Sequence, residues 1–148
     1  MATSTQALKQ QTGMAGEFLV AGELNRHGKL ATVMFGNAKN ADVVVINNGR
    51  AITVEVKTTS KDKWAIGNSL PTSSGNVVWV LVYLPVNKLE PPEYYILTSK
   101  ELCKILNSSN NAYRKKYFKK HGKPYTGKSV FSVERVLVQV HKDCWSKI

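Results

Sequence analysis

ADVVVINNGRAITVEVKTT, residues 41–59, decides the fold of this chain. Two apolar runs flank Asn48-Gly49, and Asn-Gly is the dipeptide that two-residue β-hairpin turns favour. We therefore predict antiparallel strands over 42–46 and 51–59. Facing residues in such a hairpin are fixed by the turn, and counting outward from it places Asp42 directly opposite Glu55.

The charges in this stretch interrupt its apolar pattern. Val54 and Val56 share one face of the second strand, while Glu55 and Lys57 lie on the other, where Lys57 is the diagonal neighbour of Asp42. Facing carboxylates repel unless a cation lies between them or one is protonated. Mg²⁺ binds one or two carboxylates and completes its shell with water and phosphate oxygens. The pattern thus predicts a metal site for a phosphodiester, and the open alternative is a surface salt bridge of Lys57 with both carboxylates.

Residues 6–27 are predicted to form one helix, because apolar residues recur in them at helical spacing. Glu17 precedes Leu24 by two turns, which places its carboxylate on or beside the apolar face. A helix packed on the sheet would bring Glu17 to the rim of the same acidic spot, although a structural edge residue is the alternative. Glu23 is expected at the surface, paired with Arg26.

The remaining pattern completes an α/β domain with a mixed central sheet. It predicts a short edge strand within 28–36, a loop over 64–76, a strand buried on both faces over 77–84, a strand over 94–98 and a capping box at 98–101 ahead of a short helix. Over 133–140 the apolar spacing favours a helix, but the high valine content keeps a strand as the alternative. There are no internal repeats and no clear linker, so 1–148 is expected to be a single domain.

The net charge of the chain predicts the chemical class of its partner. Twenty-one Lys and Arg residues against ten Asp and Glu give a formal net charge of +11, which favours a polyanion such as nucleic acid. Cys103 and Cys144 are far apart in the sequence, so free thiols and a reducing, cytoplasmic location are expected. No apolar run approaches the roughly 20 residues that cross a bilayer, so no membrane association is expected.

The stretch from Leu102 to Val133 holds no acidic residue. Its lysines and arginine alternate with tyrosines, and we predict that segment 113–125 grips phosphates while the tyrosines stack on exposed bases. An ordinary solvated loop with its aromatic rings in the core is the alternative. The candidate nucleic-acid-binding residues are Arg114, Lys115, Lys116, Lys119, Lys120 and Lys123.

A known family shares the motifs of the first half. Gly16-Glu17 in the helix, Asp42 at the start of a strand and Glu-x-Lys at 55–57 resemble the PD-(D/E)XK nuclease superfamily. The layout looks closest to small archaeal Holliday-junction resolvases and related restriction-type nucleases. The resemblance covers about residues 1–60. Ala41 stands where the motif's name has Pro, at a position that is tolerant in the family.

The resemblance implies a restriction-endonuclease-like fold and hydrolysis of DNA phosphodiesters with Mg²⁺, or Mn²⁺ as a substitute. Asp42, Glu55 and the Val56 carbonyl would bind the metal, Lys57 would orient or help to deprotonate the attacking water, and Glu17 would assist. A homodimer is implied by analogy, since two active sites cut two strands. Two other functions stay open: a catalytically inactive nucleic-acid-binding module of the same fold, and a protein that cleaves or binds RNA.

Overall fold

The computed structural model describes residues 5–36, 41–72, 76–128 and 130–148. Within these residues no helix is both long and apolar enough to cross a membrane. In chain order the elements are α1 (Thr5–Arg26), β1 (Leu30–Val33), β2 (Val43–Asn47), β3 (Arg50–Thr59), β4 (Lys63–Gly67), β5 (Val77–Tyr83), β6 (Glu93–Thr98), α2 (Ser99–His121), β7 (Phe131–Glu134) and the 3₁₀ segments η1 (Arg135–His141) and η2 (Trp145–Lys147).

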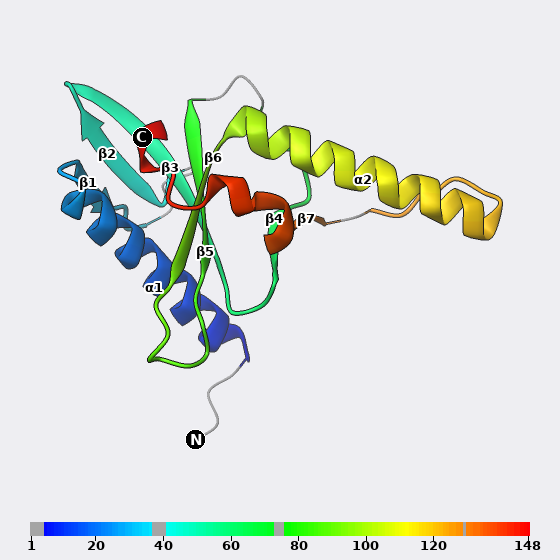
Figure 1. Cartoon of the computed structure of the whole chain (residues 1–148), viewed down its shortest axis with the longest axis horizontal. Helices are drawn as coiled ribbons and strands as arrows, with labels where there is room; N and C mark the ends of the chain where they lie inside the picture. Colours follow the sequence, from blue (N-terminus) through cyan, green and yellow to red (C-terminus); the bar gives the residue numbers. More distant parts are fainter. Residues whose placement is uncertain (1–4, 37–40, 73–75, 129) are drawn as a thin grey trace.

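The main sheet is mixed, as predicted. Its strand order is β1-β2-β3-β5-β6, in which β3 and β5 run parallel and the other neighbours antiparallel. A second, two-stranded sheet pairs β4 with β7. Helix α1 lies along the main sheet, while α2 extends away from the body of the molecule (Figure 1).

The β2–β3 hairpin forms where the sequence predicts it. Asn48 and Gly49 both have positive φ, 49° and 75°, which two-residue turns with the right twist require. Asn47 pairs with Arg50, and the ladder continues to Val43 opposite Val54. The turn therefore sets which face of β3 each later side chain occupies.

Two apolar cores lie on opposite faces of the main sheet. Val80 on β5 is buried in the core that α1 covers with Val20 and Leu24, whereas Leu81, the next residue, is buried in the core beneath α2. Strand β5 is thus buried on both faces, as its continuous apolar run predicts.

The predicted loop over 64–76 is partly wrong, because β4 occupies its beginning, and its residues 73–75 lie outside the described part of the chain. Trp64 is 1% exposed, and its Nε1 donates a hydrogen bond to the Val82 carbonyl at 2.9 Å. Strand β4 pairs with β7 far downstream. A local pattern does not contain such a long-range partner, so the Gly- and Ser-rich composition that follows dominated the prediction.

Helix α2 is much longer than the short helix predicted after the capping box. The box itself is present at Thr98 and Glu101, but the helix spans 23 residues and ends at Gly122, whose φ is 66°. Its distal half has no apolar stripe, yet Lys and Arg are good helix formers. The predicted helix over 133–140 is wrong at its start: the chain forms β7 and then the 3₁₀ segment η1.

Candidate active site

Strand β3 brings Glu55 and Lys57 together. Val54 and Val56 are buried toward α1, so the alternating residues project from the opposite face of the sheet. There Lys57 Nζ lies 2.7 Å from Glu55 Oε1, with side chains that are 29% and 20% exposed. The ammonium also lies 5.9 Å from the centre of the Trp79 ring. This half-buried ion pair is the basic unit of the site.

Asp42 is fixed by backbone contacts immediately before β2. Its N–H donates to the Val54 carbonyl at 3.1 Å, although Val54 is already the ladder partner of Val43. A β-bulge is a place where two residues of one strand face a single residue of the other, and β-bulges are common beside active sites. The Asp42 carboxylate turns toward β3, where Oδ2 accepts a hydrogen bond from the Val56 N–H at 2.7 Å. The regular ladder therefore stops one pair short of the predicted Asp42–Glu55 pair.

Glu17 reaches the site because α1 lies very close to β3. Gly16 is buried, and a Cβ atom built on it would lie 1.8 Å from Thr58 Oγ1. Only glycine permits this approach without a shift of helix or strand. The next residue, Glu17, thereby comes within electrostatic range of Asp42, Glu55 and Lys57.

The group carries more negative than positive charge. Burial is the largest cause that raises the pKa of Glu17 above its ordinary value, and the charge of Asp42 adds to it. Burial also raises the pKa of Asp42; the Val56 N–H opposes the rise, the Glu55 charge adds to it and Lys57 again opposes it. Three carboxylates thus face one lysine, an arrangement that an additional cation would stabilise.

The donor set fits a hard divalent cation that keeps much of its water. Among the described residues, no group of three or more His, Cys, Asp or Glu side chains could hold a metal ion. A metal would therefore depend on Asp42, Glu55 and a backbone oxygen. The Val56 N–H faces Asp42, and the C=O of an extended residue leaves the strand on the same side as its N–H. Two carboxylates and one carbonyl suit Mg²⁺, which retains several waters.

The predicted nucleic-acid-binding residues lie apart from these carboxylates, on other elements. They occupy the distal half of α2 and the turn after it, which we call the basic arm, residues 114–123; it projects from the body of the protein (Figure 1). All six are exposed: Arg114, Lys115, Lys116, Lys119, Lys120 and Lys123.

The tyrosines beside the basic arm contact one another. Tyr113 and Tyr117 both pack edge-on against Tyr125, with ring centroids 5.3 and 5.1 Å apart, and His121 stacks on Tyr117. These contacts tie the chain after α2 back to the helix. Segment 113–125 is therefore mostly helix. Its tyrosine rings lie outside the core, where Tyr125, in the loop after α2, packs against the helix.

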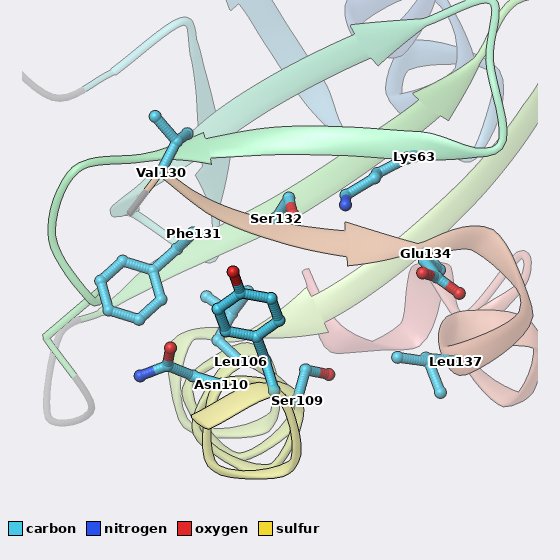
Figure 2. A pocket seen from close by; sticks show the side chains of 10 residues that line it. Lys63, Leu106, Ser109, Asn110, Val130, Phe131, Ser132, Glu134 and Leu137 are labelled. Atoms are coloured by element: carbon cyan, nitrogen blue, oxygen red, sulfur yellow. The ribbon is translucent and has the colours of Figure 1, made fainter. Parts of the chain in front are cut away.

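Sequence reasoning missed a hollow of about 420 Å³ between α2 and β7. Figure 2 shows the helix on one side and the strand on the other, with Lys63 reaching in from β4. Tyr113, one of the tyrosines predicted to stack on bases, lines it, whereas none of the six predicted phosphate-binding residues does. The only sequence signal of this hollow was the helical spacing of Leu106, Ser109, Asn110 and Tyr113, which form one of its walls. The opposite wall depends on the β4–β7 pairing, which no local pattern predicts.

Comparison with known proteins identifies the fold. No family model matches the sequence, and no curated protein is similar to it. Among solved structures, the Holliday junction resolvase Hjc of Archaeoglobus fulgidus superposes with a TM-score of 0.51 at 14% identity, over 86% of this chain and 88% of that one. The bacterial homing endonuclease I-Ssp6803I superposes with a TM-score of 0.47 at 16% identity, over 68% and 70%. The superposition on the resolvase shows that the chain has a restriction-endonuclease-like fold with a mixed central sheet, as the sequence resemblance implied.

Proposed function

We propose that this protein is a metal-dependent endonuclease that hydrolyses DNA phosphodiester bonds at the Asp42, Glu55 and Lys57 cluster. The observation that carries the proposal is that Asp42 Oδ2 accepts a hydrogen bond from the Val56 N–H at 2.7 Å, between Glu55 and Lys57, whose side chains lie 2.7 Å apart. Helix α1, the residue before β2 and strand β3 bring these groups and Glu17 together in a fold that a Holliday junction resolvase shares.

Asp42, Glu55 and the Val56 carbonyl would hold Mg²⁺, with Mn²⁺ as a substitute. When bound, such a cation supplies Lewis-acid stabilisation of the phosphate and lowers the pKa of water. The hydrogen bond from the Val56 N–H holds one oxygen of Asp42 in place. Positioning of this kind is the protein's own contribution to a metal site.

Lys57 and Glu17 would act on the attacking water. Lys57 already lies at hydrogen-bonding distance from Glu55, so it is held at the edge of the cluster where a phosphate would arrive. Its ammonium donates hydrogen bonds to a water or phosphate oxygen, and loss of one proton would let it act as a base. Glu17, half-buried on the other side, accepts a hydrogen bond from water and so orients it.

The basic arm would supply affinity without reading sequence. Lysine contacts to phosphates bind any strand and weaken with salt. We propose a junction-resolvase-like or restriction-type substrate because the resolvase that superposes on this chain shares its fold. A homodimer would supply the second active site that two strands require.

One observation favours a second candidate, the inactive binding module. Lys57 Nζ lies 2.7 Å from Glu55 Oε1, so the two charges neutralise each other. If this ion pair persists when DNA and Mg²⁺ are present, the cluster binds neither metal nor water, and the protein only binds nucleic acid.

The test is a substrate panel with Mg²⁺, Mn²⁺ or EDTA. Supercoiled plasmid, a four-way junction, a linear duplex and a matched RNA duplex are incubated with wild type and Lys57→Ala. We expect metal-dependent cleavage of DNA by wild type alone, with binding by the variant nearly unchanged. Binding without cleavage under every metal would support the inactive module, and cleavage of RNA alone would replace the DNA assignment.

A further inference from the structure

The hollow beside α2 has the size and shape of a small-ligand site. Its volume of about 420 Å³ lies in the range of pockets that enclose a small organic group, roughly 300–1,000 Å³. Leu106, Ser109, Asn110 and Tyr113 form its α2 wall, since their spacing places them on one helical face. The opposite wall is β7, with Phe131 at one end and Glu134 toward the other (Figure 2).

Its polar groups are available to a ligand. Across the part of the chain that the structure describes, the side chains of Ser109, Asn110 and Ser132 form no hydrogen bond with the protein. An amide offers both donors and an acceptor, and each hydroxyl can do either. Apolar surface comes from Val130 and Leu137, which are 56% and 45% exposed, and from the Phe131 ring.

This combination suits a flat heterocycle. Unstacked nucleobases are recognised by aromatic or apolar surface on the ring faces and by hydrogen bonds to their edges. Lys63 and Glu134, which are paired across β4 and β7, put one charge of each sign in the lining. The hollow is therefore close to neutral and offers no particular attraction to a phosphate.

The basic side chains that would attract phosphates lie just outside the hollow. Arg114 directly follows Tyr113, and Lys116 and Lys120 follow within two turns of the same helix. A strand whose phosphates lie along the basic arm would thus pass the mouth of the hollow. We propose that the hollow takes one unstacked nucleobase of that strand, so that the protein favours nucleic acid with unpaired bases. This inference rests on the proposed function for its nucleic-acid partner.

The test measures binding in EDTA, so that no cleavage occurs. The probes are a single-stranded DNA oligonucleotide, its blunt duplex, and the same single strand with abasic sites in place of its central bases. Asn110→Leu removes the amide and fills part of the hollow. Asn111→Leu is the matched control, because Asn111 is exposed on the same helix and does not line the hollow.

We expect wild type and Asn111→Leu to bind the intact single strand at least about fivefold more tightly than the abasic strand, since stacking of one base supplies that much. Asn110→Leu should bind both strands alike, at the abasic level. Equal affinity of wild type for intact and abasic strands would overturn the inference, as would equal behaviour of the two variants. Cleavage of duplex DNA by a protein without this preference would leave the proposed function intact, whereas absence of all nucleic-acid binding would remove both.

Discussion

At the scale of single residues, Gly16 controls the position of Glu17. Gly16→Ala places a methyl group against Thr58 Oγ1 and 2.9 Å from Thr58 Cβ, so α1 must move away from β3. We expect a loss of about 1–3 kcal/mol in the free energy of unfolding, as overpacked cores show. If the proposed nuclease function is correct, activity should fall further than stability alone explains. Chemical denaturation and plasmid cleavage measure the two effects.

Gly22→Ala is the matched control for this substitution. No atom lies within 4 Å of a Cβ at Gly22, so the change should stabilise α1 by about 1 kcal/mol through helix propensity. Thr58→Ala should partly rescue Gly16→Ala by removing the clashing hydroxyl. An unfolding curve of Gly16→Ala that matches wild type would show that α1 does not need this close approach.

The ionised carboxylate of Asp42 should lower the stability of the folded protein when no metal is bound. Because its folded-state pKa is raised, the folded protein binds the proton more tightly, and stability falls as pH rises from the ordinary value of 3.8 through the folded pKa. Asp42→Asn, whose side-chain oxygen can still accept the Val56 N–H, should therefore melt higher than wild type at neutral pH in EDTA. Below pH 3.8 the two should melt alike.

The same melting measurements, repeated with Mg²⁺, test the proposed metal site. We expect Mg²⁺ to raise the melting temperature of wild type and to leave Asp42→Asn unchanged, since ligands stabilise only a state that binds them. Equal shifts in both proteins would exclude Asp42 as a ligand.

The charged residues of the site were predictable because their spacing is local. Asn48-Gly49 fixes the register of β3, and alternation then places Glu55 and Lys57 on one face. The bulge at Asp42 was not predictable from the sequence. It depends on the Val56 N–H, which donates its hydrogen bond to the Asp42 carboxylate and not to the backbone of a neighbouring strand. The Gly16–Thr58 contact also joins elements whose packing no local pattern specifies.

At the scale of elements, α2 joins a buried half to a basic half, and this permits an internal control. Lys115→Ala/Lys119→Ala should weaken DNA binding and lower the slope of log affinity against log salt by about 0.9 for each phosphate that the variant no longer neutralises. Lys100→Ala/Lys104→Ala removes the same charge from the proximal half of the helix and should have a smaller effect. Equal weakening by both pairs would mean that only net charge matters.

The start of α2 should make the protein sensitive to acid. Burial of Glu101 opposes its ionisation, but hydrogen bonds from Lys147 and from Thr98 outweigh burial and lower its pKa to about 2. A depressed pKa contributes stability above the ordinary value of 4.5, and the contribution is lost as pH falls from 4.5 to about 2. Glu101→Gln should melt lower than wild type at neutral pH, and the difference should vanish near pH 2.

Glu134→Gln is the control for that titration. Glu134 is exposed, and the salt bridges of the described residues do not include it, so its variant makes the same Glu-to-Gln change without breaking an ion pair. A constant difference between Glu101→Gln and wild type from neutral pH down to about pH 2 would contradict the assigned ionisation.

The elements differ in how much of them the sequence determines. The capping box and the β5 run are local signals, and both are confirmed. Strand β4 was missed because its partner β7 is distant in sequence, and with it the hollow was missed. The length of α2 was missed because a helix that projects into solvent has no apolar stripe to reveal it.

At the scale of the whole molecule, the candidate catalytic residues and the basic arm lie on different elements. Glu17 lies on α1, Asp42 immediately before β2, and Glu55 and Lys57 on β3, whereas α2, β4 and β7 line the hollow and α2 carries most of the basic arm. Strand β5 connects the two halves, since it pairs with β3 and is buried on both faces. We propose that this arrangement separates bond cleavage from substrate capture, so variants of one half should leave the other function intact.

The most direct measurement of the central claim is cleavage of supercoiled plasmid in Mg²⁺ by wild type, Glu55→Gln and Glu23→Gln. Glu23 is a half-buried carboxylate, 23% exposed, that pairs with Arg26 at 2.6 Å, so its variant controls for loss of one ion-paired negative charge. We predict nicked or linear plasmid with wild type and Glu23→Gln, no cleavage with Glu55→Gln, and none in EDTA. Cleavage by Glu55→Gln at the wild-type rate would contradict the proposed active site.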